Sequence, residues 1–190
     1  MIVGLTGRKR CGKSTLARLL VERHGFRELS FAEPLKRMAL AANPIVGFRS
    51  TPNGAQRVHL SDVVHEIGWE RAKDEYPEVR RFLQRLGTEG VRDNLGEDTW
   101  VNIAEREIRA AGYARRLVFP DVRFDNEARL IRWFGGTVVE VRRPTAIADT
   151  ADNHRSERLE VTPDRVVTNV EGDPEASFNA IVKILQLNRR

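Results

Sequence analysis

Eight residues near the start of the sequence, Gly7 to Ser14, have the spacing of a loop that binds phosphate. They read GRKRCGKS and fit the pattern G-x-x-x-x-G-K-[ST]. Glycines at both ends of such a loop let the backbone curl, so that its N–H groups point toward phosphate oxygens. Lys13 would then reach the β and γ phosphates of a nucleotide, and the Ser14 hydroxyl would bind Mg²⁺. The loop therefore predicts chemistry on a nucleoside triphosphate.

A second polar group follows an apolar segment at residues 117–121. Asp121 ends this segment, and Arg123 comes shortly after it. An aspartate at the end of a strand could hold Mg²⁺ through water, and an arginine could clamp a phosphate with paired hydrogen bonds. A local ion pair between Asp121 and Arg123 is the plainer alternative. We expect Asp125 only to cap the next helix.

Arginines are also dense between residues 142 and 158. Arg142 and Arg143 follow another apolar segment, and Arg155 lies further along. Enzymes catalyse phosphoryl transfer mainly by positioning and charge stabilisation, and mobile arginines that close over the phosphates would also exclude water. We therefore expect residues 143–163 to form a lid. For Arg155, a place on a solvated surface loop is an equal alternative.

These side chains need a sheet to hold them. Short apolar segments predict strands at residues 2–6, 26–31, 117–121, 137–141 and 165–168. Helical periodicity covers residues 13–24 and 35–42, most of 61–112, and then 126–134 and 174–187. Strands that alternate with helices indicate an α/β fold with a mainly parallel sheet. Ligands bind such sheets beyond the carboxyl ends of the strands, so the loops after Thr6, Phe31, Asp121 and Val141 should converge.

The chain length fits a single domain. We expect its core to comprise residues 1–33, 113–142 and 164–190, with a helical insertion at 34–112 and the lid at 143–163. Within the insertion, residues 43–60 have turn composition and no period, which predicts a long mobile loop. Ser61 is the expected N-cap of the following helix, and Gly87 and Gly112 are the expected ends of two later helices.

Composition restricts the class of protein. The net charge is +5 and the isoelectric point is near 9.9, which suits either nucleic acid or phosphorylated small molecules. The arginines are interleaved with acidic residues, so we expect solvated helix faces and no stable nucleic-acid partner. The single Cys11, the lack of a long apolar run and the absence of a signal-peptide core favour a cytoplasmic protein without a membrane span.

Five stretches of the sequence fit one known pattern together: LTGRKRCGKST, SFAEPLKRM, FLQRLGTEGVRDNLGEDTWV, PDVRFDNEA and VRRPTAIADTADNHRSE. They resemble the phage deoxynucleoside monophosphate kinases, a branch of the P-loop nucleoside monophosphate kinases. The resemblance implies a three-layer P-loop kinase fold, with a helical monophosphate-binding insertion and an arginine-rich lid. It also implies transfer of the γ-phosphoryl group of ATP to a deoxynucleoside 5′-monophosphate, with Mg²⁺ bridging the phosphates, and a possible homodimer in the host cytoplasm.

The same resemblance implies the site residues. Those for ATP are Gly7, Arg10, Cys11, Gly12, Lys13, Ser14, Thr15, Asn169 and Gly172, with Ser14 and, through water, Asp121 for the metal. Those for the acceptor are Lys36, Arg37, Gln84, Thr88, Arg92, Trp100, Arg123 and Glu127. Those for catalysis are Lys13, Arg123, Arg142, Arg143 and Arg155. Trp100 also lies on an apolar helical face, where core packing competes with base stacking.

Two other functions remain open from the sequence. Dephospho-coenzyme A kinase, or another small P-loop kinase, would use the same loop with a different acceptor. A nucleic-acid-binding ATPase would account for the basic charge.

Overall fold

The computed structural model describes residues 1–112, 116–144, 161–170 and 173–187. The chain divides into two compact units. Unit 1 comprises Met1–Phe31 and Val101–Arg190, and unit 2 comprises Ala32–Trp100. Within the described ranges, no helix is both long and apolar enough to cross a membrane.

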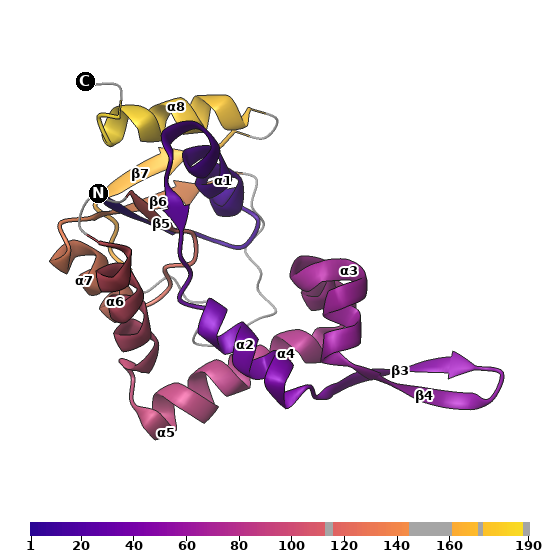
Figure 1. Cartoon of the computed structure of the whole chain (residues 1–190). Helices are drawn as coiled ribbons and strands as arrows, with labels where there is room; N and C mark the ends of the chain where they lie inside the picture. Colours follow the sequence, from indigo (N-terminus) through magenta and orange to yellow (C-terminus); the bar gives the residue numbers. More distant parts are fainter. Residues whose placement is uncertain (113–115, 145–160, 171–172, 188–190) are drawn as a thin grey trace. The chain divides into compact units, whose positions relative to one another are not determined.

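Unit 1 is built on a five-stranded sheet in the order β2-β5-β1-β6-β7 (Figure 1). Its strands are β1 (Ile2–Thr6), β2 (Arg27–Glu28), β5 (Leu117–Phe119), β6 (Thr137–Arg142) and β7 (Arg165–Thr168). Every neighbouring pair is parallel. The predicted α/β fold with a parallel sheet is therefore confirmed, although β2 and β5 are shorter than the predicted strands.

Helices cover both faces of this sheet (Figure 1). Side chains alternate along β1, so Val3 and Leu5 face one layer and Ile2 faces the other. The first layer is formed by α1 (Lys13–His24) and α8 (Pro174–Ile184). The second is formed by α6 (Thr99–Ala111), from Val101 onward, and α7 (Asp125–Trp133). The fold is thus the expected three-layer arrangement.

The register of the strands brings the loops together at one edge. Gly4 of β1 pairs with Phe119 of β5, and beyond β5 the backbone N–H of Val122 donates to the carbonyl oxygen of Leu5 at 3.2 Å, so Asp121 lies beside the end of β1. On the other side, Thr6 pairs with Glu140, so the end of β6 lies beside the start of the loop after β1. Because all strands are parallel, every one of these loops leaves the same edge.

Unit 2 combines helices with a two-stranded antiparallel sheet. Its elements are α2 (Glu33–Ala42), β3 (Ile45–Thr51), β4 (Gly54–His59), α3 (Leu60–Glu75), α4 (Pro77–Arg85), the π-helix η1 (Leu86–Arg92) and α5 (Asp93–Leu95). It has a core of its own, in which Ala39, Leu60 and Val79 are buried together.

The predicted loop at residues 43–60 is wrong, because β3 and β4 form a hairpin there. Thr51 pairs with Gly54, which leaves Pro52 and Asn53 as the turn. Val46 and Val58 anchor the hairpin in the core of unit 2, but Phe48 is 70% exposed. With most side chains of both strands in solvent, no alternation of apolar and polar residues marks the hairpin in the sequence.

Two of the residues predicted to mark helix ends do not do so. Helix α3 begins at Leu60, so its N-cap is His59 and not Ser61, and the backbone N–H of Ser61 donates to Oδ1 of Asn43 at 2.8 Å. Gly87 does not end a helix, because η1 continues through it. A Cβ at Gly87 would lie 2.8 Å from Cδ2 of Leu35, so this glycine allows η1 to pack against α2. The end of α6 before Gly112 is as predicted.

Candidate functional site

The predicted phosphate loop joins β1 to α1 at the carboxyl edge of the sheet. Gly7 and Gly12 have φ angles of 135° and 104°, which residues with a side chain rarely adopt. A Cβ on Gly7 would lie only 2.3 Å from the carbonyl oxygen of Val141 in β6. Both glycines are therefore required by backbone conformation, and Gly7 also by the close approach of the neighbouring strand.

The start of α1 is suited to an anion. Its N-cap position, Gly12, provides no side-chain hydrogen bond, and the first turn contains no acidic residue. The first backbone N–H groups of a helix lack intrahelical partners and lie at the positive end of the helix dipole. The Ser14 side chain is exposed here and Thr15 is half-buried. This combination is the usual means by which a helix binds phosphate.

The Lys13 side chain folds back over the loop. Its ammonium group donates to the carbonyl oxygens of Gly7 and Arg8, each at 2.8 Å. It also lies 3.5 Å from Sγ of Cys11, which is buried in the core of unit 1. The loop thus encloses a positive charge at the place where the sequence predicts phosphate. Arg10 takes a left-handed conformation, with φ 61°, and its side chain is exposed.

Asn169 follows β7 and lies against the same loop. Its Nδ2 donates to the carbonyl oxygen of Cys11 at 2.7 Å, and its Oδ1 accepts from the hydroxyl of Ser177 at 2.9 Å. Asn169 and Ser177 are both buried. The other predicted ATP-binding residue in this region, Gly172, lies outside the described residues.

Asp121 is held at the end of β5 by the residues that follow β2. Its Oδ2 accepts from the Ser30 hydroxyl at 2.6 Å, and its Oδ1 accepts from the backbone N–H of Phe31 at 3.2 Å. These bonds fix the carboxylate at the same edge of the sheet as the phosphate loop. The sequence does not single out Ser30, but its place near the end of the second predicted strand, residues 26–31, is the signal that could have found it.

Arg123 is placed by the start of α7. The carboxylate of Glu127 accepts from the backbone N–H of Arg123 at 2.8 Å and from that of Phe124 at 3.1 Å. Glu127 is buried, and it closes the first turn of the helix as the acid of a capping box does. The prediction that Asp125 caps this helix is wrong, because the N-cap is Phe124 and Asp125 is the first residue of α7. Arg123 therefore lies on a segment whose backbone is fixed by a carboxylate.

Arg142 is the last residue of β6 and Arg143 follows it, close to the phosphate loop because Thr6 pairs with Glu140. The guanidinium of Arg142 makes two hydrogen bonds with the carboxylate of Glu140, at 2.9 and 2.8 Å, and these bonds raise the pKa of Arg142. Arg143 is half-buried, and its Nε has no hydrogen-bond partner among the described residues. Arg155 and most of the predicted lid lie outside the described residues.

In unit 2, three predicted acceptor residues gather at η1. Thr88 and Arg92 are buried within it, and the indole N–H of Trp100 donates to the carbonyl oxygen of Gly87 at 3.0 Å. A guanidinium N–H of Arg92 donates to the carbonyl oxygen of Glu97 at 2.9 Å. Single-turn π-helical segments occur often at functional sites, because they move side chains off the regular helical face.

The remaining predicted acceptor residues of unit 2 lie on the neighbouring helices. Lys36 and Arg37 lie on α2, where Lys36 forms an ion pair with Glu33 at 3.8 Å and Arg37 is exposed. Gln84 is half-buried near the end of α4, next to the start of η1.

The oxygen donors at the edge of the sheet fit Mg²⁺. This ion binds through one or two protein oxygens and otherwise through phosphates and water, so it needs no cluster of protein ligands. No cluster of three or more His, Cys, Asp or Glu side chains suited to a metal occurs in the part of the chain that the structure describes. The exposed hydroxyl of Ser14 and the fixed carboxylate of Asp121 are suitable donors. The buried hydroxyl of Thr6, directly before the loop, has no hydrogen-bond partner among the described residues.

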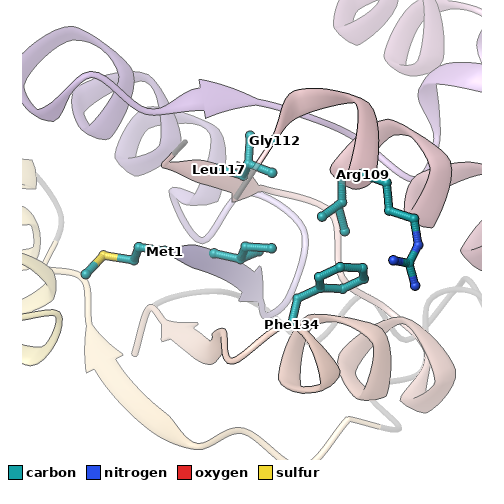
Figure 2. A pocket seen from close by; sticks show the side chains of 7 residues that line it. Met1, Arg109, Gly112, Leu117 and Phe134 are labelled. Atoms are coloured by element: carbon teal, nitrogen blue, oxygen red, sulfur yellow. The ribbon is translucent and has the colours of Figure 1, made fainter. Parts of the chain in front are cut away.

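A small cavity lies at the other end of the sheet (Figure 2). Its volume is about 50 Å³, and it is lined by Met1, Ile2, Ile108, Arg109, Gly112, Leu117 and Phe134. Figure 2 shows the Arg109 side chain beside the ring of Phe134, and its guanidinium carbon is 5.3 Å from the ring centroid. Ligand pockets usually measure roughly 300–1,000 Å³. This cavity is thus too small for a nucleotide, and it lies at the start of β1, away from the loop.

The family profile and the curated proteins that match this chain carry the same description. The profile of the family described as deoxynucleotide monophosphate kinase matches residues 50–176. A proposed deoxynucleotide monophosphate kinase of Acanthamoeba polyphaga mimivirus is 32% identical over 174 residues, covering 83% of this chain and 80% of that protein. The deoxynucleotide monophosphate kinase of Enterobacteria phage T4 is 32% identical over 133 residues, covering 67% of this chain and 51% of its own length.

Among solved structures, shikimate kinase from Aquifex aeolicus aligns with 99% of this chain and 98% of its own, at 12% identity and a TM-score of 0.48. This likeness is too low to support an inference. The family match is the stronger finding, and it begins after the phosphate loop. The loop and the family match are therefore separate observations.

Proposed function

Because this chain belongs to the deoxynucleotide monophosphate kinase family, we propose that it transfers the γ-phosphoryl group of ATP to a deoxynucleoside 5′-monophosphate. Family membership makes the protein a nucleoside monophosphate kinase, and the choice of ATP and of a deoxyribose acceptor is the proposal. An oxygen of the acceptor phosphate attacks the γ phosphorus, and the bond between that phosphorus and the β–γ bridging oxygen breaks. The products are ADP and a deoxynucleoside diphosphate.

The observation that carries this proposal is the phosphate loop. It has two glycines at left-handed φ angles and a lysine folded over its carbonyl oxygens, followed by an uncapped helix start. Backbone N–H groups of this loop bind the β and γ phosphates, and Lys13 moves from the loop carbonyls to the phosphate oxygens. The chain thereby supplies positive charge where the transferred group becomes most negative.

The residues at the edge of the sheet have separate tasks in this proposal. The Ser14 hydroxyl and, through water, Asp121 would hold Mg²⁺, which would neutralise phosphate charge. Arg123 binds the acceptor phosphate, and Glu127 positions the backbone of Arg123. Arg142, Arg143 and Arg155 stabilise charge in the transition state and exclude water.

Unit 2 supplies the groups that recognise the base. Thr88 and Gln84 carry the hydroxyl and amide that read a base edge, and Arg92 and Trp100 hold η1 in place beside them. Lys36 and Arg37 on α2 add positive charge for a phosphorylated acceptor. We assign the reaction to the cytoplasm, where the one buried thiol, Cys11, stays reduced.

A panel of acceptors tests the proposal. ADP release from ATP and Mg²⁺ is measured with the four deoxynucleoside monophosphates, their ribose counterparts and dephospho-coenzyme A, and separately with duplex DNA alone. We expect turnover with at least one deoxynucleotide and at least tenfold less with its ribose form. Turnover with dephospho-coenzyme A only would favour that kinase, and DNA-stimulated hydrolysis without an acceptor would favour a nucleic-acid-binding ATPase.

A further inference from the structure

A short chain of buried hydrogen bonds joins the phosphate loop to the last strand and last helix of unit 1. The Ser177 hydroxyl donates to Oδ1 of Asn169 at 2.9 Å, and Nδ2 of Asn169 donates to the carbonyl oxygen of Cys11 at 2.7 Å. We propose that Asn169 and Ser177 are positioning residues that hold the loop in its phosphate-binding shape before ATP arrives. This inference rests on the proposed use of ATP and adds a role that the motif itself does not contain.

The chemistry of the three groups allows only one direction for this chain. A backbone carbonyl can only accept, so the NH₂ group of Asn169 must face Cys11. The amide oxygen then faces Ser177, whose hydroxyl proton completes the chain. The hydroxyl also lies 3.3 Å from the carbonyl oxygen of Thr168, a longer and weaker alternative for the same proton. The Cys11 carbonyl therefore fixes which way the amide of Asn169 points, and the Ser177 hydroxyl holds the amide oxygen in that orientation.

Asn169 contacts the loop at a second point. A Cβ on Gly12 would lie 2.2 Å from Nδ2 of Asn169, so the amide occupies the space that any side chain at position 12 would need. Asn169 is itself anchored, because its backbone N–H donates to the carbonyl oxygen of Arg142 at 2.6 Å. The amide is thus a rigid support at the turn from the loop into α1.

The loop needs such a support because its N–H groups must point inward. Curling the backbone this way turns carbonyl groups outward, and a buried carbonyl requires a donor. Lys13 serves the carbonyls of Gly7 and Arg8, but it has to leave them in order to meet phosphate. The bond from Asn169 to Cys11 involves no group that binds the nucleotide, so it can persist throughout. A loop already in its bound shape costs less to order when ATP binds.

The role is one of positioning, since both hydrogen-bonding groups of the Asn169 side chain have protein partners. The Asn169→Asp variant tests it. An ionised carboxylate would repel the carbonyl of Cys11, whereas a protonated carboxyl has one donor and one acceptor and can replace the amide. Burial disfavours the ionised form, so protonation is accessible at mildly acidic pH.

ATP binding is measured by titration calorimetry at pH 8 and pH 5.5, as the ratio of the variant Kd to the wild-type Kd at the same pH. We expect a ratio of at least 10 for Asn169→Asp at pH 8 that falls below 3 at pH 5.5. Ser177→Ala should give a ratio of about 3 at both pH values, because the Asn169 amide loses the hydrogen bond to its oxygen but keeps the one it donates to Cys11. Asn102→Asp, an exposed change of the same charge on α6, should give a ratio near 1.

Steady-state kinetics separate positioning of the loop from a general loss of stability. Ser177→Ala should raise the KM for ATP by the same factor as the Kd and leave the KM for the monophosphate unchanged. The inference would be overturned if Ser177→Ala raised the KM values for ATP and for the monophosphate equally. It would also be overturned if both folded variants, Asn169→Asp and Ser177→Ala, had Kd ratios to wild type below 2. If Asn169→Asp does not fold, the result for Ser177→Ala alone decides the question. Wild-type protein that binds no ATP would instead overturn the proposed function, and with it this role.

Discussion

Lys13 is the residue on which the proposed chemistry depends most directly, and its ammonium group lies on the carbonyls of its own loop. Its position could be predicted from the sequence, because the motif fixes the spacing of glycines and lysine between a strand and a helix. Asp121 was predicted at the edge of the sheet for a similar reason. Its partner Ser30 was not, because a hydrogen bond between the ends of two strands depends on strand order.

Replacing Lys13 by alanine should lower turnover by about 10²–10³-fold, since it removes the charge that meets the transferred phosphoryl group. The melting temperature should stay close to that of the wild type, because the side chain is only half-buried. Lys183→Ala removes an exposed lysine from α8 and serves as the control, with turnover within twofold of wild type. A folded Lys13→Ala protein with normal turnover would contradict the assignment.

Arg123→Ala should act on the acceptor. A lost charge-assisted pair of hydrogen bonds should raise the KM for the monophosphate by about 10- to 100-fold, while the KM for ATP changes little. The matched control is Arg129→Ala, which removes a surface arginine that pairs with Asp125 on the same helix. If the two variants share normal acceptor kinetics, Arg123 has a structural role only.

At the scale of elements, the five strands of unit 1 follow from short apolar segments separated by helices, and their parallel order follows from that alternation. Two elements of unit 2 could not be predicted from such sequence patterns. The hairpin of β3 and β4 has few buried side chains, and η1 runs through Gly87, a residue that ordinarily ends helices. Glycine is there because of Leu35, which is distant in sequence and becomes visible only in the folded chain.

The packing of α1 against α8 provides a test by pH. Arg23 of α1 makes two hydrogen bonds with Glu175 of α8, at 2.7 and 2.6 Å, and these bonds lower the pKa of Glu175. A lowered pKa stabilises the fold above the carboxyl's ordinary value of 4.5, and this contribution is lost as the pH falls through the lowered pKa.

Glu175→Gln should therefore lower the melting temperature at pH 7 by about 1–3 °C, a small effect because the pair is exposed. The difference from wild type should disappear once the pH is well below 4.5, where both proteins lack the charge. Glu22→Gln, which breaks a pair within α1 only, should have a smaller effect at pH 7. An unchanged difference at low pH would show that the ionised pair does not link the two helices.

For the whole molecule, the important feature is that each unit has its own core. Unit 1 packs two apolar layers against the sheet, and unit 2 packs a separate cluster around Leu60 and Val63. The phosphate loop and Arg123 lie in unit 1, whereas the buried acceptor candidates Thr88 and Arg92 lie in unit 2. Each ligand should therefore stabilise mainly the unit that binds it.

Hydrogen exchange can follow this division. ATP with Mg²⁺ should slow amide exchange in residues 7–15, and the accepted monophosphate should slow exchange in residues 84–92. A ligand at about 100 times its Kd can stabilise its unit by about 2.7 kcal/mol, or roughly 100-fold in exchange rate. Residues 49–56 at the tip of the hairpin should not change with either ligand. Protection by the monophosphate confined to residues 7–15 would remove η1 from the acceptor site.

The indole of Trp100 is buried against the carbonyl of Gly87, whereas that of Trp133 on α7 is 80% exposed. An indole in apolar surroundings emits at shorter wavelength and is shielded from aqueous quenchers. Acrylamide should therefore quench the fluorescence of Trp133 first. The remaining emission should come mainly from Trp69 and Trp100, both of which belong to unit 2. The protein thus carries an optical reporter beside η1, which can follow nucleotide binding without a dye or label.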